Sequence, residues 1–294
     1  MNSIIITAHR EEKTIGKTLD SILQQGREED EIICVCPDLE TRKRIKEYEK
    51  KYKNVKCIQD PKEGKPTALN LAIQEASGDI LILTDGDVFL GDNSLKEILK
   101  PFKDKKVGIV SGRPFSLNPR SNKWGYFSHL LTDVGAHETR LKQIKKNKMI
   151  VCSGYLYAFR KNLIKIIPEE IFSEDALISH LIHEMGYKTE YAPQAKVFVK
   201  YPDNFKDWII QKRRSTGGYN QLKFYLKHKE RMRSFSKEVY GIVRIFSYPR
   251  NFKEFLWTIE LVFLRIYLWL LVFKDVTIQK KGLKEVWLRV ESTK

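Results

Sequence analysis

The sequence predicts an α/β fold in which a mostly parallel sheet is flanked by helices. Short apolar runs that are typical of buried strands alternate four times with amphipathic stretches that are typical of helices. Such an order favours parallel strands joined by right-handed crossovers. The 294 residues, of which 42% are hydrophobic and 31% charged, suit a globular chain with one large domain or one domain plus an appendage.

The first half of the chain supplies the regular part of this fold. Each expected strand is a short run rich in Ile, Val, Leu or Cys, and a polar loop follows it. The expected helices carry apolar side chains three and four residues apart on one face, such as Ile15, Leu19 and Ile22. These patterns predict strands at 3–7, 31–36, 55–58, 80–83 and 107–111, and helices at 14–24, 39–53, 67–76 and 94–103.

The second half is less regular. A helix at 174–185 is indicated by Leu177, Leu181 and Ile182, which share one face. The remaining expected elements are a helical stretch at 121–147, a strand and turn at 149–159, and short strands at 187–191 and 196–201.

Positive charge is concentrated towards the end of the chain. The net charge is +16, and residues 205–254 contain 13 Lys and Arg against 4 Asp and Glu. Such an excess indicates an anionic partner: a nucleic acid, an anionic lipid or a phosphorylated substrate. Composition divides the chain into an α/β domain at 1–204, basic interfacial helices at 205–250, and a hydrophobic C-terminal helix and tail at 251–294.

Two carboxylates, Asp85 and Asp87, directly follow a buried strand. In open α/β sheets, ligands bind at the carboxyl ends of the strands. Gly86 lets the backbone turn tightly, so that both carboxylates face one point and hold a hard divalent cation and, through it, a phosphate-bearing substrate. The alternative is a polar turn whose acidic side chains face water, because Asp and Gly are common turn residues.

Polar loops after the other expected strands meet at the same edge of the sheet. Asp38 is placed to accept hydrogen bonds from a base or ribose, and Lys65 to meet a diphosphate. Oxygen ligands at Asp85 and Asp87 favour Mg²⁺ or Mn²⁺. Together these loops indicate a nucleotide site. The sequence has no Gly-x-x-x-x-Gly-Lys-Ser/Thr run and no Gly-x-Gly-x-x-Gly after the first strand, so a phosphate loop of that kind and a dinucleotide site are not expected.

Several stretches resemble the family 2 glycosyltransferases, which are inverting enzymes with the GT-A fold. The opening IIITAHREEKTIGKTLDSIL is similar to their first strand, loop and helix, with residues 9–12 in place of the usual aromatic-Asn-Glu-Glu. EGKPTALNLAIQEASGDILILTDGDV is similar to their Gly-Lys-x-x-Ala-Leu-Asn helix and Asp-x-Asp metal motif. CSGYLYAFRKNLI resembles the acceptor loop, and SEDALISHLIHEMGYKTEYAPQA resembles the Glu-Asp segment.

The resemblance implies a GT-A, Rossmann-like catalytic domain and roles for its motif residues. Asp175 would be the general base that takes a proton from an acceptor hydroxyl. Asp87, with Asp85, would hold Mg²⁺ or Mn²⁺ on the diphosphate of the leaving group. The nucleotide-sugar would be bound by Thr7, Ala8, Glu11, Asp38, Lys65 and Asp85. The acceptor and the diphosphate would be contacted by Ser153, Gly154, Glu174, Gln211 and Arg214.

The Glu174-Asp175 pair also has a purely structural interpretation. Ser173 followed by two acids suits the start of a helix. Both interpretations hold together if the helix N-terminus fixes the base in place.

The run at 211–214 resembles the Gln-x-x-Arg-Trp motif of polysaccharide synthases and their relatives. There Arg214 would neutralise diphosphate charge. Ser215 replaces the Trp of that motif, so the resemblance does not extend to stacking of a growing sugar chain or to processivity. The alternative for this run is a basic face on an interfacial helix.

The stretch at 255–273 is 19 residues long, which is enough to span a bilayer core. Arg265 near its middle and Glu260 make spanning marginal, because a central charge costs about 2.5–3.5 kcal/mol on insertion scales. The preceding basic segment suits an anionic membrane surface. We expect peripheral or single-anchor attachment at the cytoplasmic face of the cell membrane. Packing on the catalytic domain, or in a homodimer, is the alternative.

The sequence thus predicts a metal-dependent inverting glycosyltransferase that uses a nucleotide-diphospho-sugar and a hydroxyl of a lipid-linked or surface glycan. The nearest alternative is a polyprenyl-phosphate sugar synthase, whose phosphate acceptor has less need of a base, so the Glu174-Asp175 pair argues against it. An alternative of another class is a basic lipid- or nucleic-acid-binding protein on a GT-A-like scaffold. No nucleic-acid partner is expected under the favoured interpretation.

Overall fold

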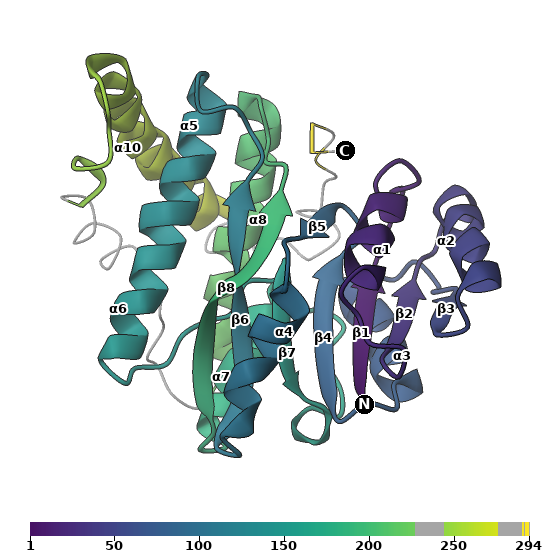
Figure 1. Ribbon diagram of the computed structural model, residues 1–294. Coiled ribbons are helices and arrows are strands. Elements are labelled where there is room, and N and C mark those ends of the chain that lie inside the picture. Colours follow the sequence, from purple (N-terminus) through teal and green to yellow (C-terminus); the bar gives the residue numbers. More distant parts are fainter. Residues whose placement is uncertain (227–243, 276–289, 291, 294) are drawn as a thin grey trace.

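A mixed eight-stranded sheet runs through the centre of the molecule, with helices on both faces (Figure 1). The computed structural model describes residues 1–226, 244–275, 290, 292 and 293. The basic helices expected at 205–250 and the tail expected at 251–294 therefore lie partly outside the described residues. The predicted α/β fold, with a mostly parallel sheet and a C-terminal helix, is confirmed.

The strand order is β3-β2-β1-β4-β7-β6-β8-β5. Strands β1 to β4 are parallel, and β7 runs antiparallel between β4 and β6. Strands β6 and β8 are parallel to each other, and the short β5 pairs antiparallel with β8 at the edge. The strands are β1 (Asn2–Thr7), β2 (Glu31–Val35), β3 (Val55–Ile58), β4 (Ile80–Asp85), β5 (Val88–Leu90), β6 (Val107–Ser116), β7 (Leu156–Arg160) and β8 (Lys188–Val199).

The helices of the α/β part are α1 (Ile15–Leu23), α2 (Leu39–Lys51), α3 (Lys65–Glu75), α4 (Ser94–Leu99), η1 (Lys100–Lys103), η3 (Lys161–Leu163) and α7 (Glu174–Glu184). The remaining described helices are α5 (Lys123–Leu130), the π-helix η2 (Leu131–Glu138), α6 (Thr139–Lys145), α8 (Phe205–Gln221), η4 (Leu222–Phe224) and α10 (Phe252–Phe273).

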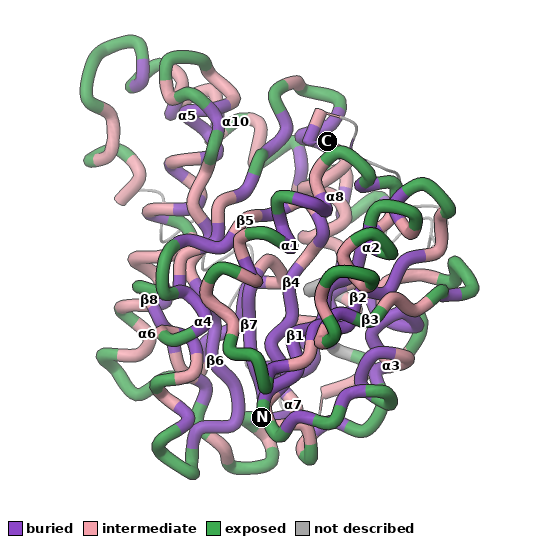
Figure 2. Tube along the Cα trace, turned by 45° about the vertical axis from the view of Figure 1, so that its right-hand side comes forward, coloured by how far each residue is buried: buried purple, intermediate pink, exposed green. Residues whose placement is uncertain are grey.

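The run Ile4-Ile5-Ile6 in β1 shows how the sheet is buried from both sides. Ile4 and Ile6 point into an apolar cluster with α1 and α4, whereas Ile5 points into a second cluster with α3 and α7. Successive side chains of a strand alternate between the two faces of a sheet. All three are fully buried, and the central strands are drawn as buried in Figure 2. A strand covered on both faces is a continuous apolar run, which is the pattern that predicted it.

A third apolar cluster joins the C-terminal helix to the rest of the fold. Helix α10 packs against α5 and α8 through Tyr126, Trp208, Leu261 and Leu268, and Figure 1 shows α10 and α5 far from β1 to β3. The Tyr126 hydroxyl also shares a hydrogen bond with the Thr258 hydroxyl inside this cluster. One face of α10 is therefore docked on the protein.

The opposite face of α10 is apolar and exposed. Phe263, Leu270 and Phe273 are 66%, 64% and 58% exposed. In the described part of the chain, α10 is the helix that is long and apolar enough to cross a membrane. Within its most apolar 18 residues, 22% is buried against the protein.

The structure differs from the prediction at β8, where one long strand replaces the two expected at 187–191 and 196–201. Ser111 of β6 pairs with Tyr191, and Arg113 pairs with Lys196, so β8 has extra residues at this point. Pro193 lies in this irregular part. The position suits proline, because proline cannot donate a hydrogen bond to a neighbouring strand. The break read from the sequence is a bulge within one strand.

Candidate active site

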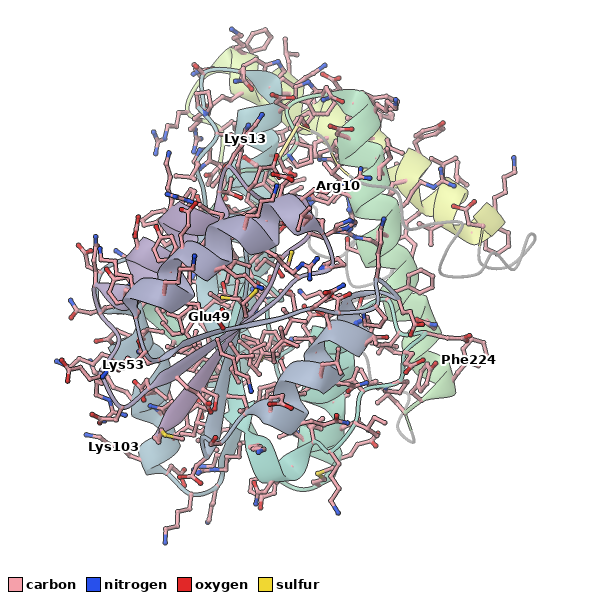
Figure 3. All side chains as sticks on the ribbon, turned by 90° about the vertical axis from the view of Figure 1, so that its right-hand side faces the viewer. Arg10, Lys13, Glu49, Lys53, Lys103 and Phe224 are labelled. Atoms are coloured by element: carbon pink, nitrogen blue, oxygen red, sulfur yellow. The ribbon has the colours of Figure 1, made fainter. Side chains whose placement is uncertain are left out.

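A cleft of about 1250 Å³ opens at the carboxyl ends of β1 and β4, next to the first turns of α3 and α7. Figure 3 shows Arg10, in the loop after β1, on this side of the sheet, and Lys53 and Lys103, which precede β3 and β6, on the opposite side. The structure brings all but one of the expected site residues to the wall of this cleft. They are Thr7, Ala8, Glu11, Lys65, Asp85, Asp87, Ser153, Gly154, Glu174, Asp175, Gln211 and Arg214.

Lys65 joins the end of β4 to the start of α7. Its Nζ lies 2.7 Å from Asp85 Oδ1 and 2.9 Å from Glu174 Oε1. Burial disfavours the charge of Lys65, but the two carboxylates outweigh burial and hold its pKa well above the ordinary value. Thr7 Oγ1 also donates a hydrogen bond to Asp85 Oδ1. One cation thus joins the start of α3 to the end of β4 and the start of α7, and the hydrogen bond from Thr7 adds the end of β1.

The chain around Lys65 is shaped by the residues beside it. Gly64 has a backbone φ of +121°, which residues other than glycine rarely adopt. Pro66 lies in the first turn of α3, where no backbone N–H is required. This sequence starts α3 directly after a sharp bend and points Lys65 into the cleft.

The need for glycine at position 86 is spatial rather than conformational. We expected Gly86 to allow a tight turn, but its φ lies outside the left-handed region. A Cβ built at Gly86 would overlap Glu11 Oε2 and lie 2.8 Å from Ala8 Cβ. Glu11 is 7% exposed, so the glycine lets the loop after β1 approach the Asp85–Asp87 segment closely.

Asp38 is the expected site residue that does not line the cleft. It caps α2 by accepting a hydrogen bond from the Thr41 N–H, and it accepts another from the Arg10 N–H at 2.7 Å. Partial burial alone would raise the pKa of Asp38, but these hydrogen bonds outweigh burial and hold it at about 2. In this structure Asp38 fixes the loop after β1.

Asp175 lies in the first turn of α7 and faces the loop at Ser153-Gly154. A Cβ built at Gly154 would lie 3.2 Å from Asp175 Oδ2, so glycine permits this approach. Burial, and then the neighbouring Glu174 carboxylate, raises the pKa of Asp175 to about 7, although Lys65 and the N–H groups of Ala176 and Gly154 oppose the rise. A carboxylate tuned in this way can take a proton near neutral pH.

Tyr155 is a cleft residue that we did not single out in the sequence. Gln211 Nε2 on α8 is 3.4 Å from its hydroxyl oxygen, and its ring packs edge-on against Tyr201. Burial, and then the nearby Asp87 and Asp85, raises the pKa of Tyr155. The phenol therefore lies between the Asp pair and the Gln-x-x-Arg run. Its sequence signal is its position directly after Ser153-Gly154.

A divalent metal would be held by Asp85 and Asp87. The described residues contain no group of three or more His, Cys, Asp or Glu side chains arranged to hold a metal by themselves. Mg²⁺ is usually bound by one or two carboxylates together with substrate phosphates and water. Two cleft-lining carboxylates separated by one residue fit that mode of binding.

The chain is similar to known proteins in sequence and in fold. The sequence profile of the family described as "Glycosyl transferase family 2" matches residues 3–167, which is more than half of the chain. The chain is 26% identical over 233 residues to the poly-beta-1,6-N-acetyl-D-glucosamine synthase of Staphylococcus epidermidis, covering 75% of this chain and 55% of that protein. It thus spans about half the length of the curated relatives it matches.

Two solved structures share the fold. The mannosyltransferase PcManGT from Pyrobaculum calidifontis, in complex with GDP-Man and Mn²⁺, has a TM-score of 0.63 at 18% identity, over 88% of this chain and 73% of that one. S. aureus TarS 1-349, in complex with UDP-GlcNAc, has a TM-score of 0.52 at 17% identity, over 88% of this chain and 78% of that one. At these identities the likeness concerns the fold.

Proposed function

Since this chain belongs to glycosyl transferase family 2, and is therefore a nucleotide-sugar-dependent transferase of an inverting family, we propose a specific reaction for it. It moves a sugar from a nucleotide-diphosphate donor to a hydroxyl of a lipid-linked or surface glycan, with the help of Mg²⁺ or Mn²⁺. The observation that carries this proposal is one cleft that holds both the Asp85–Asp87 pair and a buried carboxylate of raised pKa, Asp175.

The donor lies on the side of Asp85 and Asp87. A metal bound there would stabilise the negative charge of the nucleoside diphosphate as it leaves. Lys65 and Arg214 add positive charge from α3 and α8, on two sides of the same space. Charge-assisted contacts of this kind are stronger than neutral ones and suit a diphosphate.

The acceptor lies on the side of Asp175. Its hydroxyl gives a proton to the Asp175 carboxylate as its oxygen attacks the anomeric carbon, and the bond from that carbon to the diphosphate breaks in the same displacement. Attack opposite the leaving group inverts the anomeric carbon. A phosphate acceptor has less need of a base, so the raised pKa of Asp175 favours a hydroxyl acceptor over a polyprenyl-phosphate one.

The donor site is tested by the thermal stability of the purified protein with a panel of nucleotide-sugars. We expect one donor to raise the melting temperature by several degrees only when Mg²⁺ or Mn²⁺ is present, because ligands that bind the folded state stabilise it. Asp87→Ala should abolish this increase. Asp79→Ala is the matched control, because Asp79 is exposed and directly precedes the other end of β4.

Two results would contradict the donor site. One is the absence of stabilisation by any donor with either metal. The other is full metal-dependent stabilisation in Asp87→Ala. Salt-sensitive binding of nucleic acid without any donor effect would favour a basic binding protein instead.

We also propose that α10 attaches the protein to the membrane by its exposed face. Glu254 and Thr258 are buried on the docked face, whereas Phe263 and Leu270 point away from the protein. A helix that places polar groups on protein and apolar groups outward suits a position along the membrane surface. With residues 1–204 as the catalytic domain and the basic segment 205–250 between it and α10, the cleft then lies near the bilayer.

A further inference from the structure

The cleft has two chemically different walls. The wall built from strand ends and α7 carries the carboxylates, which are Glu11, Asp60, Glu63, Asp85, Asp87, Glu174 and Asp175. A second wall is built from η2, α6, α8, α10 and the segments 199–201 and 244–245. The described residues that line it include the cations Arg140, Lys200, Lys212, Arg214, Arg244 and Arg265, and no carboxylate. The second wall therefore favours an anion.

Arg140 is the most deeply buried of these cations. It is 6% exposed, and its Nε donates a hydrogen bond to the Val151 carbonyl at 3.0 Å. Its guanidinium carbon lies 5.9 Å from the centre of the Tyr191 ring. Its Nη1 is buried without a hydrogen-bond partner among the described residues. An unpaired buried donor is unfavourable, so an acceptor atom from a ligand would satisfy it.

Arg140 is also connected to the proposed base. Its partner Val151 belongs to the same loop as Gly154, whose N–H contacts Asp175. Cys152 lies between Val151 and Gly154. Burial raises its pKa most; among the nearby charges, Arg140 lowers this pKa and Asp175 raises it. Arg140 therefore lies on the acceptor side of the cleft, across the loop from the base.

A second cation and an apolar surface complete this part of the cleft. Arg244 Nη2 is 2.8 Å from Glu138 Oε2, and its Nε is buried without a hydrogen-bond partner among the described residues. The wall around the two arginines is apolar, and it is lined by Leu131, Val134, Ile245, Leu261 and Trp269. Leu261 and Trp269 belong to α10, whose other face is exposed and apolar.

We propose that this part of the cleft binds the acceptor by a phosphate group joined to an apolar chain. The phosphate accepts hydrogen bonds from Arg140 Nη1 and Arg244 Nε, because the guanidinium fork suits phosphate oxygens. The apolar chain lies against η2 and α10 and leaves towards the exposed face of α10. The assignment rests on the proposed glycosyl transfer and specifies its acceptor as a lipid phosphate that carries the accepting hydroxyl.

The proposal is tested by titrating the full-length protein with farnesyl phosphate, farnesol and inorganic phosphate. Binding is followed by tryptophan fluorescence, because Trp269 lines this part of the cleft. We expect farnesyl phosphate to bind about tenfold or more tightly than either of the others, since it alone carries both groups. Arg140→Gln should weaken the binding of farnesyl phosphate about tenfold, which is the effect of losing one charge-assisted hydrogen bond. The binding of farnesol should be unchanged.

Arg160→Gln is the matched control, because Arg160 Nε also donates to a backbone carbonyl, that of Val107, but Arg160 does not line the cleft. Arg244→Gln should repeat the effect of Arg140→Gln, and it keeps the test valid if Arg140→Gln does not fold. Equal binding of farnesol and farnesyl phosphate, or unchanged binding in both cleft variants, would overturn the proposal. If inorganic phosphate binds as tightly as farnesyl phosphate, the apolar chain contributes nothing, and the lipid part of the proposal is wrong.

The same variants separate this proposal from the donor site. Arg140→Gln should retain metal-dependent stabilisation by the nucleotide-sugar. A protein that no nucleotide-sugar stabilises, but that still binds farnesyl phosphate through Arg140, would contradict the proposed transfer and leave the lipid-phosphate site standing.

Discussion

Single ionisable groups in the cleft depend on one another for their charge. Lys65 lies 2.7 Å from Asp85 and 2.9 Å from Glu174, so it remains protonated in spite of burial. Asp175, next to Glu174 in the chain, is left with burial and a like charge, which raise its pKa to about 7. One lysine thus pairs with two carboxylates, while the pKa of the neighbouring Asp175 is raised into the range of proton exchange near neutral pH.

Asp175→Asn should lower transfer about 100-fold or more while donor binding is kept, because the base is lost and the volume is nearly unchanged. In the unaltered protein, transfer should rise with pH through about 7 as Asp175 loses its proton. The measurement is the transfer rate against pH, with donor stabilisation as the control. A variant that still transfers at the original rate would assign the proton to another group.

The same pKa has a consequence for stability. The folded pKa of Asp175 exceeds its ordinary value of 3.8, so the folded state binds more protons than the unfolded state between these two values. Stability is therefore lost as the pH rises through about 7. The gain in melting temperature from Asp175→Asn should be larger at about pH 8 than at about pH 4.

Gly86→Ala should destabilise the fold by about 1–3 kcal/mol, as overpacking does, because the new Cβ would overlap Glu11 and Ala8. It should also weaken binding of the nucleotide-sugar donor, since Asp85 and Asp87 flank the shifted residue. Gly217→Ala is the matched control: no atom lies within 4 Å of its added Cβ, and it lies inside α8, where alanine is the better helix former. Equal melting temperatures for the two variants would contradict this account of Gly86.

At the scale of elements, α10 is held by two ion pairs that differ in burial. Arg120 Nε is 2.8 Å from Glu254 Oε1, and these side chains are 18% and 7% exposed. Lys123 Nζ is 2.7 Å from Glu260 Oε1, with exposures of 33% and 42%. A buried partner left alone is costly, whereas an exposed pair contributes little. Arg120 and Glu254 therefore fix the start of α10.

Arg120→Met should lower the free energy of unfolding by about 2–3 kcal/mol, because Glu254 would stay buried without its partner. Lys123→Met is the control on the exposed pair and should cost less than about 1 kcal/mol. The hydrogen bonds from Arg120 lower the pKa of Glu254, so the effect of Arg120→Met should be present above its ordinary value of 4.5 and fade as the pH falls below it. Urea unfolding at neutral and acidic pH measures both effects.

At the scale of the whole molecule, α10 presents cleft-lining groups on one side and exposed apolar groups on the other. The docked face of α10 completes the cleft with Leu261, Arg265 and Trp269, and its other face exposes Phe263 and Leu270. Under the proposed attachment of α10 to a membrane, a lipid-linked acceptor would pass from the bilayer to the cleft along this helix.

Phe263→Glu combined with Leu270→Glu should release the protein from vesicles that contain anionic lipid, because the exposed apolar face would become negatively charged and would be repelled by the lipid headgroups. Flotation of the vesicles measures the bound fraction, and we expect a loss of about tenfold or more with an unchanged melting temperature. Ile166→Glu is the control, since Ile166 is 69% exposed but lies outside α10. Unaltered flotation of the double variant would instead favour a protein partner on this face.

Local patterns predicted the α/β part of the fold and the composition of the cleft. Ile4, Ile5 and Ile6 predicted a strand because burial on both faces needs no alternation. The Asp85–Asp87 pair and Lys65 were predicted because loops after parallel strands share one edge. What local patterns missed depends on contacts across the chain. Arg140 reaches the cleft only because η2 and α6 lie beside the loop at Val151.

The π-helix η2 determines the direction in which the side chains of α6, including Arg140, point. A π-helix holds more residues per turn than an α-helix, so each residue of η2 advances the chain by a smaller angle. Upstream of η2, Tyr126 and Phe127 face α10; downstream, Arg140 faces the loop at Val151. Loss of a single residue within η2 would turn α6 by up to about 100° and carry the arginine out of the cleft. The length of this segment is therefore as tightly constrained as the identity of the residues that it positions.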